Sequence, residues 1–186
     1  MGARVILLNG PAGVGKTTVG RALASLARNG SCIHGDCLKG FIVSRMDEVV
    51  SGGLGYVNGA RVAATFIEAG YDLVVFEYVF EHPSNVDRFL ASFHLPVPIH
   101  LFTLWAPLSL VMEREQARPD RDRLGQRVMS CYRSIERHMG QLGRIIDTGD
   151  RPAADVAAHI YQLCHEGVGV VKLPHASPSR QAWEMA

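Results

Sequence analysis

A glycine-rich segment directly after an apolar run constrains this chain more than any other feature. Residues 10–17 read Gly-Pro-Ala-Gly-Val-Gly-Lys-Thr and match G-x-x-x-x-G-K-[ST], the Walker A pattern. They follow the apolar run Val5–Leu8 and precede the helix-permissive stretch Thr18–Ala27. The glycines let the backbone turn tightly, so that successive N–H groups converge on a phosphate at a helix N-terminus. The pattern therefore predicts a strand, a phosphate-binding loop and a helix, in this order.

The chemistry of this loop divides among its backbone and two side chains. Lys16 supplies a positive charge to the β- and γ-phosphates, and Thr17 offers a hydroxyl to Mg²⁺. The pattern thus implies ATP and Mg²⁺ as cofactors. The residues expected to bind the nucleotide are Gly10, Pro11, Ala12, Gly13, Val14, Gly15, Lys16, Thr17 and Thr18.

Apolar runs alternate with helical patterns along the rest of the chain. Strands are expected at residues 4–9, 31–34, 72–80, 98–105 and 144–148. Helices are expected at residues 17–28, 39–50, 59–69, 84–93, 107–118, 124–142 and 152–166, with a flexible connection at 51–55. This alternation predicts an α/β fold, a five-stranded parallel sheet with helices on both faces. Ligands of such sheets gather at the carboxyl ends of the strands.

Length and composition exclude several classes of protein. The chain of 186 residues is expected to form one domain over 1–168, with a tail or edge segment over 169–186. A formal net charge of +1 argues against nucleic acid as a partner, because nucleic-acid-binding proteins usually present a basic face. No apolar run reaches the length of a membrane span, and none of the four cysteines forms a C-x-x-C pair. A cytoplasmic protein with reduced thiols is expected. The oligomeric state stays open, with a homodimer as one candidate.

Two carboxylates fall at the predicted carboxyl edge of the sheet. Asp36 follows the second strand, where it could accept the proton of an attacking hydroxyl; the alternative is an N-cap for the next helix. Glu77 ends the third strand, where an acid can hold Mg²⁺; the alternative is a solvated carboxylate. Asp36 and Lys16 are therefore candidate catalytic residues, and Thr17 and Glu77 candidate metal ligands.

An arginine-rich stretch follows the helix that Pro107 opens. Arg114, Arg118, Arg121 and Arg123 could form a lid whose cations offset the charge of the transition state. Within it, we expect Arg118 and Arg121 to be catalytic and Arg114 to bind the nucleotide. The alternative is a solvated salt-bridge face, because four acidic residues are interleaved with the arginines. The segment Asp147-Thr148-Gly149 could contact an adenine edge or form a helix entry.

Several motifs together resemble the P-loop small-molecule kinases, most closely chloramphenicol phosphotransferase. The matching segments are residues 6–17, 35–38, 68–72, 74–77, 79–80, 114–118 and 145–148. The resemblance implies that Asp36 deprotonates the acceptor hydroxyl and that the arginine-rich segment is the lid. The wider group includes shikimate, gluconate and adenylylsulfate kinases. Two parts depart from the pattern: Glu77-Tyr78 replaces paired aspartates, and the segment 39–58 does not match clearly.

These observations favour an ATP-dependent phosphotransferase that moves the γ-phosphate to a hydroxyl of a small molecule, an antibiotic or a metabolite. One alternative is an ATP-binding resistance or regulatory protein that binds a ligand without phosphorylating it. A nucleoside monophosphate kinase is a third candidate; the lid arginines suit it, but the segment after Asp36 offers only Arg45 and Arg61 as evident phosphate anchors.

Overall fold

Five parallel strands form the single sheet of the computed structural model, which describes residues 2–44, 53–117 and 124–171. The strand order is β2-β3-β1-β4-β5, so the first strand lies at the centre. The strands are β1 (Arg4–Asn9), β2 (Gly30–His34), β3 (Leu73–Glu77), β4 (Ile99–Trp105) and β5 (Arg144–Asp147). The predicted five-stranded parallel sheet is confirmed.

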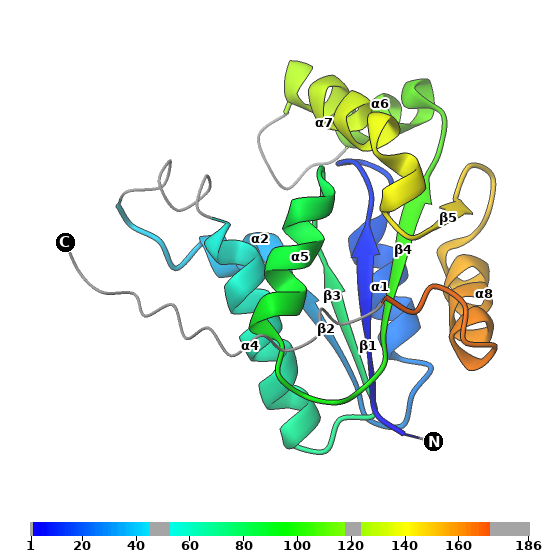
Figure 1. The fold of residues 1–186 in the computed structure, drawn as a ribbon. Helices are drawn as coiled ribbons and strands as arrows, with labels where there is room; N and C mark the ends of the chain where they lie inside the picture. Colours follow the sequence, from blue (N-terminus) through cyan, green and yellow to red (C-terminus); the bar gives the residue numbers. More distant parts are fainter. Residues whose placement is uncertain (1, 45–52, 118–123, 172–186) are drawn as a thin grey trace.

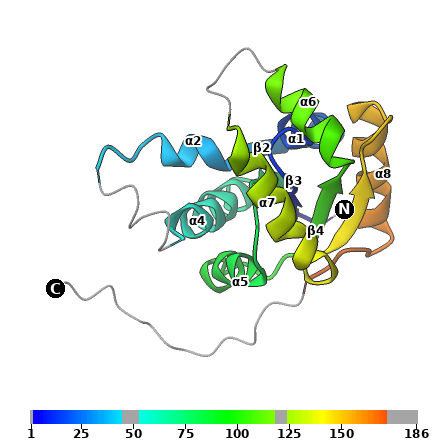
Figure 2. The ribbon, with the colours of Figure 1, turned by 90° about the horizontal axis from the view of Figure 1, so that it is seen from above.

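Helices cover both faces of the sheet, as Figures 1 and 2 show. Two of them, α1 and α8, pack on one face, and α4 and α5 pack on the other. A third pair, α6 and α7, lies across the carboxyl edge of the sheet (Figure 1). The helices are α1 (Lys16–Ala24), α2 (Gly35–Lys39), α4 (Leu54–Glu68), α5 (Pro83–Ser92), α6 (Leu108–Gln116), α7 (Gln126–Arg137) and α8 (Ala153–His165), with a 3₁₀ turn at Met139–Gln141.

The central strand is buried on both faces, which explains its continuous apolar run. Val5 and Leu7 pack with α4 and α5, whereas Ile6 and Leu8 pack with α1 and α8. Successive side chains of a strand point to opposite faces, so a strand between two helical layers needs apolar residues at every position. Within the described residues, no helix is long and apolar enough to cross a bilayer.

The prediction of a helix at 39–50 is wrong for the residues of this range that the structure describes. Instead α2 begins at Gly35 and ends at Lys39, and residues 40–44 are not helical. Residues 45–50 lie outside the described part of the chain. The expected connection at 51–55 is also partly wrong, because α4 begins at Leu54, directly after Gly53 with its positive φ of 72°. Glycines inside this helix concealed its start in the sequence pattern.

Three further helices end two or more residues earlier than expected, and the first of them, α1, stops at Ala24 instead of residue 28. Helix α6 stops at Gln116 instead of reaching Arg118, and α7 ends at Arg137, before the 3₁₀ turn. The arginine-rich segment 118–123, and with it most of the expected lid, lies outside the described residues.

The last described residues form an edge segment beside the start of β4. Val170 forms an antiparallel bridge with His100, and the Leu101 N–H donates to the Gly169 carbonyl at 2.8 Å. The His100 Nδ1 atom lies 2.8 Å from the Val168 carbonyl oxygen. Residues 172–186 lie outside the described part of the chain.

Candidate functional site

The Walker loop connects β1 to α1, and its backbone carbonyls surround the ammonium group of Lys16. Gly10, Gly13 and Gly15 all have positive φ, which favours glycine. At Gly13 a side chain would also overlap the Val111 carbonyl oxygen of α6. Lys16 is only 9% exposed, and its Nζ donates to the carbonyls of Gly10 and Pro11 at 2.7 and 3.0 Å. The ammonium therefore lies inside the loop that would hold the phosphates.

Glu77 links this loop to the neighbouring strands. The register of β3 places Glu77 beside Leu8 of β1 and His34 of β2. The Thr17 hydroxyl donates to Glu77 Oε1 at 2.8 Å, and His34 Nδ1 pairs with the same oxygen. The hydrogen bond with Glu77 outweighs the effect of burial and raises the pKa of His34. Because Glu77 is only 1% exposed, it is not a solvated carboxylate at a strand end.

The pair Thr17 and Glu77 fits a magnesium ion that is shared with nucleotide phosphates. Within the described residues, no group of three or more His, Cys, Asp or Glu side chains could hold a metal by itself. Mg²⁺ is usually bound through one or two protein oxygens together with substrate phosphates and water. A hydroxyl and a carboxylate beside the phosphate loop match that requirement.

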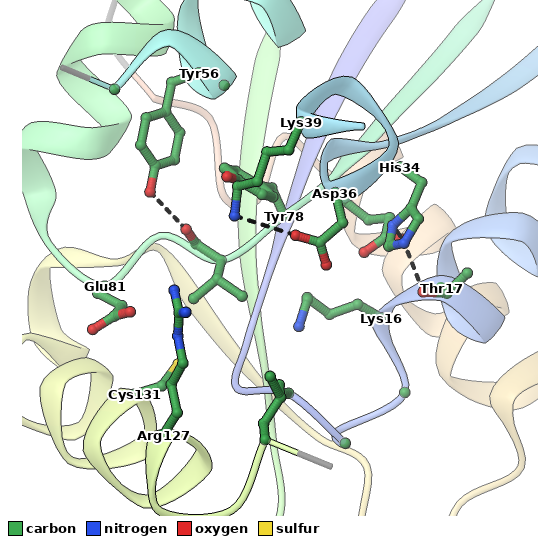
Figure 3. A pocket seen from close by; sticks show the side chains of 18 residues that line it. Lys16, Thr17, His34, Asp36, Lys39, Tyr56, Tyr78, Glu81, Arg127 and Cys131 are labelled. Carbon is green, nitrogen blue, oxygen red and sulfur yellow. Dashed lines mark hydrogen bonds and ion pairs between the residues drawn. The ribbon is translucent and has the colours of Figure 1, made fainter. Parts of the chain in front are cut away.

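Asp36 lies in the first turn of α2, on the wall of the same cavity. His34 is the N-cap of α2, so the alternative reading of Asp36 as an N-cap is wrong. Asp36 Oδ1 lies 3.3 Å from Lys39 Nζ, and the side chain of Asp36 is 45% exposed. Figure 3 shows the carboxylate on the same side of the cavity as Lys16.

A cavity of about 340 Å³ extends from the loop toward α4 and α7. Its near end holds Lys16, Thr17 and Asp36 (Figure 3). Its far walls come from α4, from the segment after β3 and from the α7 region, through Tyr56, Tyr78, Val79, Glu81, Leu124, Arg127 and Cys131. The cavity therefore has room for a second reactant beside the phosphate loop.

Sequence reasoning missed most of this far wall. Tyr56 lies in this wall, and its hydroxyl donates to the Val79 carbonyl at 2.9 Å. Arg127 and Cys131 lie four residues apart on one face of α7, a spacing that could have indicated a shared surface. Burial raises the pKa of Cys131 to about 11, so its thiol is neutral and unsuited to nucleophilic attack.

A second cavity of about 300 Å³ lies on the other side of the Walker loop. It is lined by Thr18, Arg114, Thr148 and Arg151, among others. Arg114 Nη2 donates to the carbonyls of Thr148 and Gly149, at 3.2 and 2.6 Å. The structure thus brings the expected nucleotide-binding arginine and the segment after β5 together, whereas Arg118, Arg121 and Arg123 lie outside the described residues.

Comparison with known proteins identifies the class of fold. The chain is similar in structure to a shikimate kinase from Acinetobacter baumannii in complex with shikimate, with a TM-score of 0.59 and 22% identity over 90% of this chain and 95% of that one. It is similar to the Deinococcus radiodurans tunicamycin resistance protein, with a TM-score of 0.59 and 20% identity over 91% and 99% of the two chains. It is also similar to a gluconokinase from Sinorhizobium meliloti 1021, with a TM-score of 0.59 and 20% identity over 89% and 97%.

The chain has the fold of P-loop kinases such as shikimate kinase. No protein-family model and no curated protein matches its sequence. At identities near one fifth, the structural likeness establishes the fold, and the activity has to be argued from the site.

Proposed function

We propose that this protein is an ATP-dependent phosphotransferase that moves the γ-phosphate to a hydroxyl of a small molecule. The observation that carries the proposal is the shared cavity, in which the Walker residues Lys16 and Thr17 lie beside Asp36 with space for an acceptor beyond them. Phosphoryl transfer depends mainly on positioning the reactants and offsetting their charge, and this cavity provides groups for both.

The donor half of the site would hold MgATP. The loop amides and Lys16 would bind the phosphates, and the second cavity beside Arg114 and Thr148 would receive the base. Thr17 and Glu77 would hold Mg²⁺, which when bound offsets the negative charge of the β- and γ-phosphates. We assign the role of a catalytic lid to the segment that contains Arg118 and Arg121.

The acceptor half would hold a hydroxylated compound with an apolar face. The acceptor hydroxyl gives its proton to Asp36, its oxygen bonds to the γ-phosphorus, and the bond to ADP breaks. Tyr56, Tyr78 and Val79 would pack against the apolar face. An antibiotic is supported by the sequence resemblance to chloramphenicol phosphotransferase. A metabolite is supported by the likeness to shikimate kinase and gluconokinase.

The proposal is tested by measuring ADP release from MgATP against a panel of hydroxylated antibiotics, hydroxy acids and nucleotides. Substituting Asp36→Asn should leave ATP affinity unchanged and lower turnover by about 10²- to 10⁴-fold, because the general base is lost. Asp87→Asn, on the exposed face of α5, serves as the matched control and should keep wild-type turnover. Wild-type turnover in the Asp36 variant would show that the base is assigned wrongly.

A second candidate is a protein that binds ATP and a ligand without transferring phosphate. It is favoured by the glutamate at position 77, where aspartate is more usual, and by the likeness to the tunicamycin resistance protein. Ligand binding with no ADP release above background would support it. A nucleoside monophosphate kinase has less support, because Arg61 is exposed on α4 and is not among the residues that line the cavity. Arg45, the other expected anchor, lies outside the described residues.

A further inference from the structure

Lys39 occupies an unusual position for a basic residue of this chain. Only three of its 19 basic residues are lysines, and two of these, Lys16 and Lys39, line the main cavity. Lys39 Nζ lies 3.3 Å from Asp36 Oδ1 and 4.8 Å from the centroid of the Tyr78 ring. An ammonium group is attracted to the face of an aromatic ring, so Lys39 is held from two sides.

The Tyr78 ring is itself firmly held. Tyr78 is 7% exposed, and its ring contacts those of Tyr56, Phe76 and Phe80, with centroids 5.1, 5.7 and 6.4 Å away. The backbone that follows is anchored by buried Asn9, whose Oδ1 accepts from the Phe80 N–H at 2.8 Å. The ring is thus a fixed surface on the cavity wall, whereas most lysine partners on a protein surface are mobile.

The same ring also fixes the start of α2. A side chain on Gly35 would overlap the Tyr78 ring, so the helix that carries Asp36 and Lys39 rests directly on it. Burial lowers the pKa of Lys39, but the interactions with Tyr78 and Asp36 outweigh burial and raise this pKa. Lys39 therefore stays charged over the range in which a kinase works.

We propose that Lys39, clamped over the ring of Tyr78, is a positioning residue that aims the Asp36 carboxylate at the acceptor hydroxyl. The inference rests on the proposed function, because it takes Asp36 as the base. An exposed ion pair three residues apart on a helix contributes little by itself. Here the buried ring holds the cation in place, and the cation in turn limits the orientations open to the half-exposed carboxylate.

The clamp can be tested without any acceptor. Protein labelled with ¹³C at the lysine ε-carbon gives one signal for each of its three lysines, and Lys39→Arg identifies the signal of Lys39. Ring currents from Tyr78 should displace this signal and its protons from their random-coil positions. Tyr78→Leu should remove the displacement, and Asp36→Asn should alter it. A random-coil Lys39 signal in the wild type would overturn the inference.

The effect of Lys39 on the reaction is tested by a double-mutant cycle with Asp36. The probe is ADP release from MgATP, with water and with each compound of the panel as acceptor. Lys39→Met should lower kcat by about ten- to hundredfold with the KM for ATP unchanged, since a misplaced base costs rate and not donor binding. Lys39→Arg should restore part of the loss. Lys39→Met should cause no further loss in the Asp36→Asn background, because both changes act through one carboxylate.

Additive losses in this cycle would overturn the positioning role, as would an unchanged kcat in Lys39→Met. The ATP turnover of the wild type tests the proposed function independently of this cycle. If the wild type turns over no ATP with any acceptor, phosphotransfer fails as the function, and the lysine spectrum still decides whether the clamp exists.

Discussion

At the scale of single residues, Glu77 shows how one side chain acquires several partners from the fold. The sequence places it at a strand end, and the parallel register then brings Thr17 and His34 to the same carboxylate oxygen. A glutamate reaches one methylene further than the aspartate more usual at this place. Its carboxylate accepts directly from the Thr17 hydroxyl, so this hydroxyl is held in one orientation.

We predict that Thr17→Val weakens the magnesium-dependent part of ATP binding. The hydroxyl that donates to Glu77 is lost, and groups that orient metal ligands are typically worth about ten- to hundredfold in metal affinity. Thr17→Ser keeps the hydroxyl and should bind as the wild type does. Calorimetric titration with ATP, in the presence and absence of Mg²⁺, measures the difference. Equal magnesium dependence in all three proteins would contradict the assignment of Thr17.

At the scale of elements, α4 shows why helix boundaries were harder to predict than strands. The strands were recognisable because continuous apolar runs are what a buried parallel sheet requires. Gly55 ends the segment that resembles a flexible connection, and Gly59 begins the stretch expected to be helical, yet both lie inside α4 and allow close packing. A side chain on Gly59 would overlap the ring of Phe76 in β3, and one on Gly55 would crowd the hydroxyl of Tyr78. Glycine is required at these two positions by packing against distant residues, so the sequence around them does not reveal the requirement.

We predict that Gly59→Ala destabilises the protein. In an exposed helix interior, this change would stabilise by about 1 kcal/mol through helix propensity. Here Phe76 is fully buried, and an added Cβ would lie less than 3.0 Å from three of its ring carbons. Overpacking a core costs about 1–3 kcal/mol, and so close an overlap belongs to the upper part of that range, above the gain. Arg61→Ala, on the exposed side of the same helix, should change the free energy of unfolding by less than about 0.5 kcal/mol. Urea unfolding curves compare the two, and a Gly59→Ala variant as stable as wild type would contradict this packing argument.

At the scale of the whole molecule, the strand order brings distant segments to one edge. Because β1 lies between β3 and β4, the loops after β1, β2 and β3 surround the main cavity, while the segment after β5 reaches the second one. The described end of the chain also returns to the sheet, where Val168 and Val170 lie against buried His100 of β4.

We predict that the burial of His100 makes stability fall in mild acid, although its hydrogen bond to the Val168 carbonyl acts against this effect. Burial lowers the pKa of His100 below its ordinary value of 6.5, so the unfolded chain binds a proton that the folded chain resists. Stability is therefore kept above about pH 6.5 and declines as the pH falls toward the lower folded-state pKa. His100→Asn retains a side-chain N–H but does not titrate, so its free energy of unfolding should fall less with decreasing pH than that of the wild type. The difference between variant and wild type in urea unfolding, measured from about pH 7.5 to about pH 5, checks it. Parallel pH dependences of the two proteins would count against it.

The sequence by itself determined the glycine-rich Walker loop, the alternation of strands and helices, and the placing of Asp36 and Glu77 at the carboxyl edge of the sheet. These follow from local patterns, namely backbone freedom at glycines and the burial of continuous apolar runs. Only the tertiary structure decided that Thr17 and His34 share one oxygen of Glu77 and that Lys39 lies over the Tyr78 ring. It also placed Arg127 and Cys131 in the wall of the main cavity. These contacts depend on strand register and on side-chain packing between segments far apart in the chain, which no local pattern encodes.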